Sequence, residues 1–133
     1  MNPASPPGSS PFRIRGGLRG QGDRGEEIAK LHLESVGYAL LDRGWACRSG
    51  ELDLVMRAQD GTIAIVEVKT AYRDSAGDPA GWITATKRRR LARAALEWLV
   101  AHDSLDQPAR FDLVAIAPDG TPEHFEDIFP FEE

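Results

Sequence analysis

Residues 50–70 read GELDLVMRAQDGTIAIVEVKT, and this stretch decides the fold. Two segments rich in β-branched and apolar residues, 50–56 and 62–70, lie on either side of the short sequence Gln59-Asp60-Gly61. This pattern predicts two antiparallel strands joined by a hairpin turn.

The turn also determines which side chains of the hairpin share a face. A three-residue loop with a left-handed Gly61 in a bulge makes Asp53 face Glu67 and Glu51 face Lys69. A register slipped by one residue would send Asp53 to the opposite face. The turn sequence therefore predicts that both carboxylates lie on one face of the sheet.

Charged side chains continue an apolar row on the second of these strands. Because strand side chains alternate between faces, Glu67 and Lys69 lie on the side of Ile63 and Ile65. Burying an unpaired charge costs several kcal/mol, on the order of 2–7 for a polar group and more for an ion. This end of the strand must therefore meet water, a partner or a metal ion.

Two carboxylates that face each other repel, and a divalent cation between them reverses the sign of that interaction. Hard oxygen ligands with open positions suit Mg²⁺ or Mn²⁺. We expect Asp53, Glu67 and the backbone carbonyl of Val68 as metal ligands. Lys69 would orient or deprotonate a water molecule and neutralise charge on a phosphate. The alternative is a cross-strand ion network at an open sheet end.

Two helices are expected on either side of these strands. The first spans Asp23 to Val36, with Gly37 as its C-terminal stop. Glu26 lies at the edge of its apolar arc and is the fourth catalytic candidate; alternatively, it stabilises only the positive end of the helix dipole. A second helix is expected from Pro79 to about His102.

The second helix carries a run of cationic residues. Lys87 shares a helical angle with the apolar stripe, and Arg88 and Arg90 follow it. We expect these three residues to bind the phosphates of a nucleic acid. The alternatives are a lysine that extends its stem along the helix into water and an ordinary solvated helix face.

The chain divides into an arm and one domain. Residues 1–22 are rich in Pro, Gly and Ser and predict a disordered basic N-terminal arm, and residues 23–133 predict a single domain. Further strands are expected at 38–48 and 111–117, and segment 121–131 is either an edge strand or a tail laid on the sheet. The order α-β-β-β-α-β predicts an α/β fold with a mixed β-sheet flanked by helices.

Charge and composition limit the classes of function. The net charge of −5 argues against nucleic acid at first sight, but six acidic residues and no Lys or Arg follow Pro118, which leaves 16 basic against 15 acidic residues before them. The single Cys47 excludes an internal disulfide and is expected as a structural thiol in a strand. Without a long apolar run, a cytoplasmic location is the expectation.

A family resemblance follows from these motifs. The chain resembles the YraN-like family of small, uncharacterised bacterial proteins over about residues 22–117. That family is similar to the PD-(D/E)xK nuclease superfamily, which is restriction-endonuclease-like, and to archaeal Holliday junction resolvases. The motifs that carry the resemblance are Gly25-Glu26, Gly50-Glu51-Leu52-Asp53-Leu54-Val55, Val66-Glu67-Val68-Lys69, Lys87 and Arg110-Phe111-Asp112.

The resemblance implies a role for each motif. Asp53 corresponds to the aspartate of the first motif, Glu67 and Lys69 to the second, and Glu26 to the helical acid of the resolvase-like branch. The chain departs from the family at Gly44, where other members often carry Asn, and after the motif lysine, where an Arg often follows.

The leading hypothesis is a divalent-metal-dependent, nuclease-like protein that acts on DNA, including branched or recombination intermediates. The alternative is a catalytically weak or inactive nucleic-acid-binding or recombination accessory module. A third possibility is a structural domain whose charged cluster stabilises a sheet end. A homodimer is left open, since cutting both strands of a duplex would take two sites.

Overall fold

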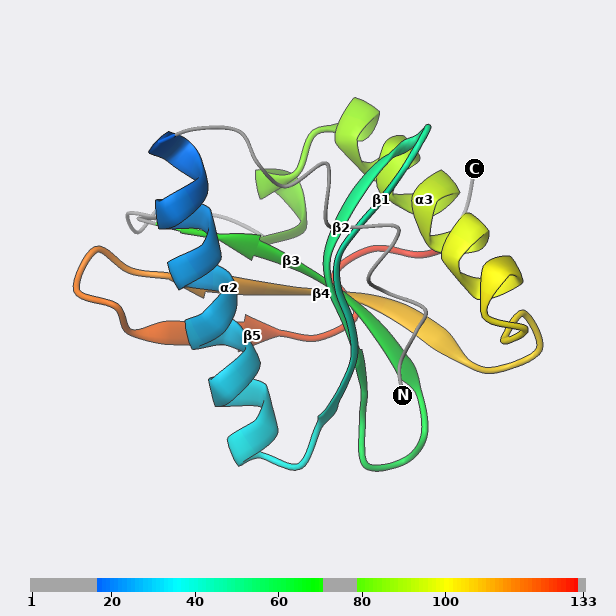
Figure 1. Cartoon of the computed structure of the whole chain (residues 1–133), viewed down its shortest axis with the longest axis horizontal. Coiled ribbons are helices and arrows are strands. Elements are labelled where there is room, and N and C mark those ends of the chain that lie inside the picture. Colours follow the sequence, from blue (N-terminus) through cyan, green and yellow to red (C-terminus); the bar gives the residue numbers. More distant parts are fainter. Residues whose placement is uncertain (1–16, 71–78, 132–133) are drawn as a thin grey trace.

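A computed structural model of the chain describes residues 17–70 and 79–131. Figure 1 shows helices on both faces of a twisted sheet. The elements are, in order, α2 (Gly17–Ser35), β1 (Ala39–Cys47), β2 (Gly50–Arg57), β3 (Ile63–Lys69), the 3₁₀ helix η2 (Pro79–Trp82), α3 (Ala85–Ala101), β4 (Ala109–Ile116) and β5 (Pro122–Phe125).

The five strands form one sheet in the order β1-β2-β3-β4-β5. Strands β3 and β4 are parallel, and every other neighbouring pair is antiparallel. A parallel pair needs a crossover connection, which α3 provides. The mixed sheet flanked by helices confirms the expected fold class and is compatible with a restriction-endonuclease-like fold.

Each face of the sheet has its own apolar core. On one face, Ala29 and Leu33 of α2 pack on alternate strand residues such as Val66 and Val114. On the other face, α3 packs its buried stripe on strand residues that include Ile63 and Ile65. Glu67 and Lys69 continue the second row, so they lie on the α3 face, as expected from strand alternation.

The predicted hairpin between β2 and β3 is confirmed. The Ala58 and Thr62 backbones pair across the turn, and Gly61 has a φ of 93°, in the left-handed region. The register that follows pairs Leu54 with Val66. Extended by one residue, this register would place Asp53 opposite Glu67; the two carboxyl groups interact, although the strand pairing itself does not reach them.

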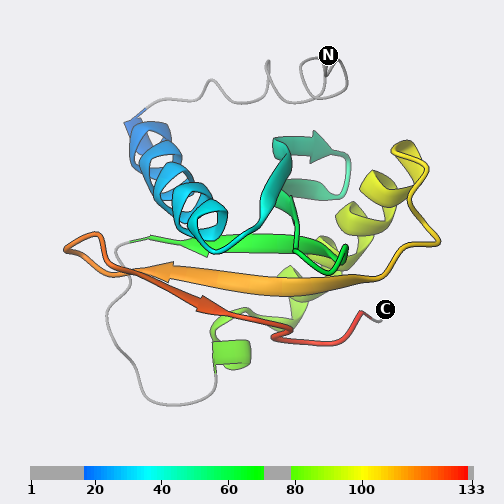
Figure 2. The same cartoon turned by 90° about the horizontal axis from the view of Figure 1, so that it is seen from below.

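The ladder between β2 and β3 ends at this point, and one prediction is therefore wrong. The paired residues stop at Leu54 and Val66, so the expected pairings of Asp53 with Glu67 and of Glu51 with Lys69 are not part of the ladder. In Figure 2, the far end of the β1–β2 hairpin curls out of the plane of the sheet. Sheet twist is large in two-stranded ribbons, and it separates the strands where the turn no longer holds them.

The first helix is longer than expected, but its end is as predicted. It begins at Gly17, six residues before Asp23, so the last residues assigned to the arm belong to a helix; residues 1–16 lie outside the described part. It ends at Ser35, where Gly37 has a φ of 101° and Tyr38 N–H donates to the Leu33 carbonyl at 3.0 Å. A left-handed glycine after the last turn is the common C-terminal cap.

The second helix begins later than predicted. Pro79 opens a four-residue 3₁₀ helix rather than α3 itself. The α-helix starts after Thr84, whose side-chain oxygen accepts a hydrogen bond from Lys87 N–H at 3.1 Å. An N-cap threonine of this kind marks a new helix start, so the expectation of one helix from Pro79 is wrong.

The C-terminal segment forms both a strand and a tail. Strand β5 pairs with β4 at the edge of the sheet. The chain then continues along β4, where Ile128 N–H donates to the Phe111 carbonyl at 2.8 Å and Phe129 stacks on Phe111. Segment 121–131 therefore forms an edge strand first and then a tail laid on the sheet, so both alternatives apply to it. Among the described residues, no helix is long and apolar enough to cross a membrane.

Candidate metal and nucleic-acid site

The candidate site lies where β2 and β3 separate. Once the ladder ends, the backbone N–H of Val68 needs an acceptor other than the neighbouring strand. The Asp53 carboxylate supplies it, with 2.8 Å between Val68 N and Asp53 Oδ2. The side chain of Asp53 thus fills the gap between the two strands and is fixed beside Glu67.

Asp53 and Glu67 form one electrostatic unit. Burial raises the pKa of Asp53 well above its ordinary value, and the charge of Glu67 raises it further, against the Val68 hydrogen bond and the charge of Lys87, which lower it. Burial also raises the pKa of Glu67, although Lys87 and a hydrogen bond with Asp53 lower it. Two carboxyl groups held together in this way favour a shared proton or a cation.

Two lysines lie beside this pair. Lys87, near the start of α3, places its Nζ atom 3.3 Å from Glu67 Oε2. Lys69, the last residue of β3, is exposed, and its charge lowers the pKa of Glu67. The structure therefore brings together Asp53, Glu67, Lys69 and Lys87, as the sequence predicts.

Glu26 is placed differently. Its buried carboxylate lies 3.7 Å from Arg43 Nε on β1. The same guanidinium donates to Glu27 at 2.8 Å and to the Asp23 carbonyl at 3.2 Å, which fastens β1 to α2. Within residues 17–70 and 79–131, no group of three or more His, Cys, Asp or Glu could hold a metal ion. Glu26 is thus not part of a common ligand set with Asp53 and Glu67, and its catalytic role stays a prediction.

The three cationic residues predicted to bind nucleic acid differ in their surroundings. Lys87 contacts Glu67, Arg88 is half-buried with its guanidinium 5.7 Å from the ring of Phe129, and Arg90 is exposed. Arg89 and Arg93 are also exposed on α3. The outer surface of this helix is strongly basic, beside the carboxylate pair.

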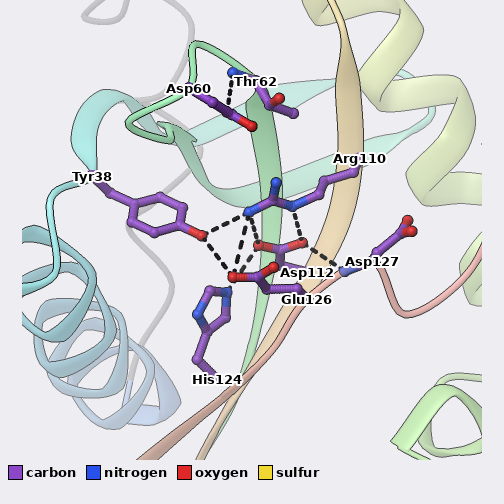
Figure 3. A network of polar contacts seen from close by, with 8 residues as sticks. All are labelled: Tyr38, Asp60, Thr62, Arg110, Asp112, His124, Glu126 and Asp127. Carbon is purple, nitrogen blue, oxygen red and sulfur yellow. Dashed lines mark hydrogen bonds and ion pairs between the residues drawn. The ribbon is translucent and has the colours of Figure 1, made fainter.

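A second polar network lies elsewhere in the fold, around Asp112 (Figure 3). Asp112 pairs with Arg110, with 2.9 Å between Arg110 Nε and Asp112 Oδ1. His124 Nε2 lies 2.9 Å from Asp112 Oδ2, and Arg110 Nη2 donates to the Tyr38 hydroxyl at 2.7 Å. Burial alone would raise the pKa of Asp112, but hydrogen bonds from His124, Arg110 and the Asp127 backbone lower it. The network joins β4, β5 and the start of β1.

Asp42, another buried carboxylate, was not predicted as a polar centre. Its Oδ2 atom accepts a hydrogen bond from Trp98 Nε1 at 2.9 Å and lies 3.7 Å from His102 Nε2. The His102 ring stacks on Trp98. His102 and His124 thus belong to polar clusters although neither has a neighbouring sequence motif, so no local signal could have found them.

The backbone conformation at Gly44 explains why this chain can carry Gly where other family members often carry Asn. It lies in β1 with a φ of 61°. Asn populates this left-handed region more readily than other non-glycine residues. Gly and Asn are therefore both suited to this position, and the departure leaves the carboxylate pair unaffected.

Comparison with known proteins identifies the family. The model of the uncharacterised protein family UPF0102 matches residues 25–116. A UPF0102 protein of Geotalea uraniireducens is 45% identical over 96 residues, which cover 71% of this chain and 74% of the relative. One from Geobacter metallireducens is 42% identical over 108 residues, covering 80% and 87%, and one from Nocardia farcinica is 45% identical over 95 residues, covering 71% and 74%.

Among solved structures, the SfsA protein of Pyrococcus furiosus in complex with Ca²⁺ is similar at 16% sequence identity and a TM-score of 0.33. The match covers 82% of this chain and 63% of that one.

Proposed function

The chain belongs to the uncharacterised protein family UPF0102, the family described above as YraN-like, and we propose that it is a divalent-metal-dependent nuclease that acts on DNA in the cytoplasm. The observation that carries this proposal is the Asp53–Glu67 pair, which lies at the point where β2 and β3 separate. Lys87 pairs with Glu67, and the charge of Lys69 lowers the pKa of Glu67.

The donor set fits Mg²⁺ or Mn²⁺. Both carboxyl groups have pKa values raised by burial, so a cation that neutralises them is favoured over their mutual repulsion. Mg²⁺ binds through one or two carboxylates and keeps further positions for water and substrate phosphate. The Val68 carbonyl remains the proposed third protein ligand. When bound, the ion would polarise a phosphate oxygen and lower the pKa of a coordinated water molecule.

The protein's own residues supply positioning and charge. Asp53 accepts a hydrogen bond from the Val68 amide and Glu67 pairs with Lys87, so each carboxylate has a partner where the two strands separate. Exposed Lys69 is suited to orient or deprotonate the attacking water and to neutralise the phosphate. Lys87, Arg88 and Arg90 would contact the substrate backbone, an interaction that weakens as salt increases.

The test is cleavage of linear, flapped and four-way DNA by the purified protein with Mg²⁺ or Mn²⁺. Wild-type protein is expected to nick at least one of these substrates only when metal is present. Asp53→Asn removes the charge and keeps an oxygen that accepts from Val68 N–H, so it is expected to fold and to lose the nicking activity. Equal nicking by the variant would contradict the proposal.

The second candidate function is a nucleic-acid-binding accessory module with weak or no turnover. One observation favours it, since Glu26 is engaged by Arg43 and, among the described residues, no third carboxylate lies close enough to share a metal ion with the pair. This function predicts salt-sensitive DNA binding that is the same with and without metal. Anisotropy of a labelled oligonucleotide with EDTA or Mg²⁺ distinguishes the two functions.

A further inference from the structure

Lys87 contacts the carboxylate pair directly. It is the third residue of α3, where the Thr84 cap fixes its backbone. Its Nζ atom lies 3.3 Å from Glu67 Oε2, within an ion pair whose lysine side chain is 48% exposed and whose glutamate side chain is 17% exposed. The ammonium group therefore bridges a largely buried acid and open solvent.

The charge of Lys87 acts on both acids. It favours the ionised form of Glu67, through a hydrogen bond as well as its charge, and it also favours ionised Asp53. The groups that face the pair are thus Lys87 from α3, Lys69 from β3 and Glu51 from β2, and Glu51 adds repulsion. Among the described residues, Lys87 is the cation that forms an ion pair with Glu67.

We propose that Lys87 is the resident counter-cation of the Asp53–Glu67 pair and that a divalent ion displaces it, which releases its ammonium group to the substrate phosphate. The inference rests on the proposed function, because it concerns the same pair of carboxylates. It goes beyond a simple phosphate contact, since Lys87 opposes metal binding in the free protein.

Displacement links metal binding to DNA binding. A side chain that is half exposed and has four rotatable carbons can leave Glu67 and reach a neighbouring anion without moving the helix. Once the metal neutralises the carboxylates, the lysine gains a phosphate as its partner. Metal and DNA should then strengthen each other's binding, and by thermodynamic linkage the two effects are equal.

The test is titration of metal-free protein with Mn²⁺ by calorimetry. Lys87→Met keeps most of the length of the side chain and removes its charge, so this variant is expected to bind Mn²⁺ about five- to tenfold more tightly than wild type. Lys87→Arg is expected to bind as wild type does. Arg89→Met is the matched control, because it removes a charge from the exposed surface of the same helix; its affinity should stay within about twofold of wild type, since distant exposed charges are screened.

A second measurement tests the release of the ammonium group. Ca²⁺, which takes the same oxygen ligands, is added to protein and a labelled oligonucleotide, and anisotropy gives the DNA affinity. Wild-type protein should gain more affinity from Ca²⁺ than Lys87→Met does. Equal gains in both proteins would overturn the release step.

The outcomes separate this inference from the proposed function. Unchanged or weaker Mn²⁺ binding by Lys87→Met, together with metal-dependent nicking that Asp53→Asn abolishes, overturns the inference alone. Tighter Mn²⁺ binding by Lys87→Met without nicking by any variant supports the inference and contradicts the nuclease. Absence of Mn²⁺ binding in both wild type and Lys87→Met overturns both.

Discussion

Replacement of Gly25 by Ala tests how α2 docks beside the candidate site. A Cβ atom at position 25 would meet the Thr70 Cγ2 atom in a severe overlap and would lie 3.3 Å from Thr70 Cβ and 3.7 Å from Val68 Cγ1. Thr70 directly follows Lys69, so α2 approaches the end of β3 closely at Gly25, on the face of the sheet that α2 covers. Only a glycine allows this approach.

Two opposing effects determine how Gly25→Ala changes the free energy of unfolding. Ala stabilises a helix interior by up to about 1 kcal/mol relative to Gly. Overpacking against a held side chain costs about 1–3 kcal/mol. Because the overlap involves a methyl group next to the β-carbon rather than the end of a flexible chain, we expect the cost to prevail. Gly25→Ala should lower the free energy of unfolding by about 1–2 kcal/mol.

A double-mutant cycle isolates the contact. Thr70→Ala removes the overlapping methyl group, so the Gly25→Ala change should be neutral or stabilising in that background. Urea unfolding followed by circular dichroism gives all four free energies from the midpoints at a common slope. If Gly25→Ala stabilises the otherwise unchanged protein by about 1 kcal/mol, as helix propensity alone requires, the close approach is refuted.

Three further predictions follow from the buried polar groups and the helix cap. The folded-state pKa of Asp53 is raised, so its contribution to stability is fully present below the ordinary pKa of 3.8 and is lost as pH rises through the raised value. In EDTA, thermal melts from pH 4 to 8 should show Asp53→Asn more stable than wild type at neutral pH by about 1 kcal/mol, with a smaller difference at pH 4. A less stable variant at neutral pH would contradict this. Asp112→Asn leaves the Arg110 guanidinium, 17% exposed, without its carboxylate and should cost about 3 kcal/mol in urea unfolding; a loss below about 1 kcal/mol would show that solvent replaces the ion pair. Thr84→Ala removes the cap of α3 and should cost about 1 kcal/mol by the same assay, whereas Thr84→Ser should stay within a few tenths.

Features that depend on residues close together in the sequence were predicted correctly. The turn Gln59-Asp60-Gly61 set the β2–β3 register because a three-residue loop allows few backbone geometries and Gly61 supplies the left-handed one. Strand alternation then placed Glu67 and Lys69 on the α3 face. Gly37 ended α2 for the same reason, since its conformation depends on the residue itself rather than on distant contacts.

Features that depend on distant residues were not predictable. The separation of β2 from β3 comes from the curl of the hairpin, which no local pattern in residues 50–54 encodes. The engagement of Glu26 by Arg43 joins α2 to β1, and helical periodicity identified only that Glu26 faces inward. The start of α3 at Thr84 was missed because Pro79 also opens helices well, so two start signals competed.

Asp53 contributes to both the fold and the candidate site, and this affects how its variants are interpreted. Its carboxylate is the acceptor for Val68 N–H where the ladder ends, so Asp53→Ala leaves a strand amide unpaired and loses a ligand at the same time. Loss of nicking in Asp53→Ala would therefore have two explanations, a disturbed strand end and a missing metal ligand. Asp53→Asn separates them, because the amide oxygen keeps the hydrogen bond while the negative charge that attracts a cation is gone. If the Asn variant melts at or above the wild-type temperature in EDTA and binds no Mn²⁺, the carboxylate is retained at a cost in stability, which is expected of a functional residue rather than of a structural ion network.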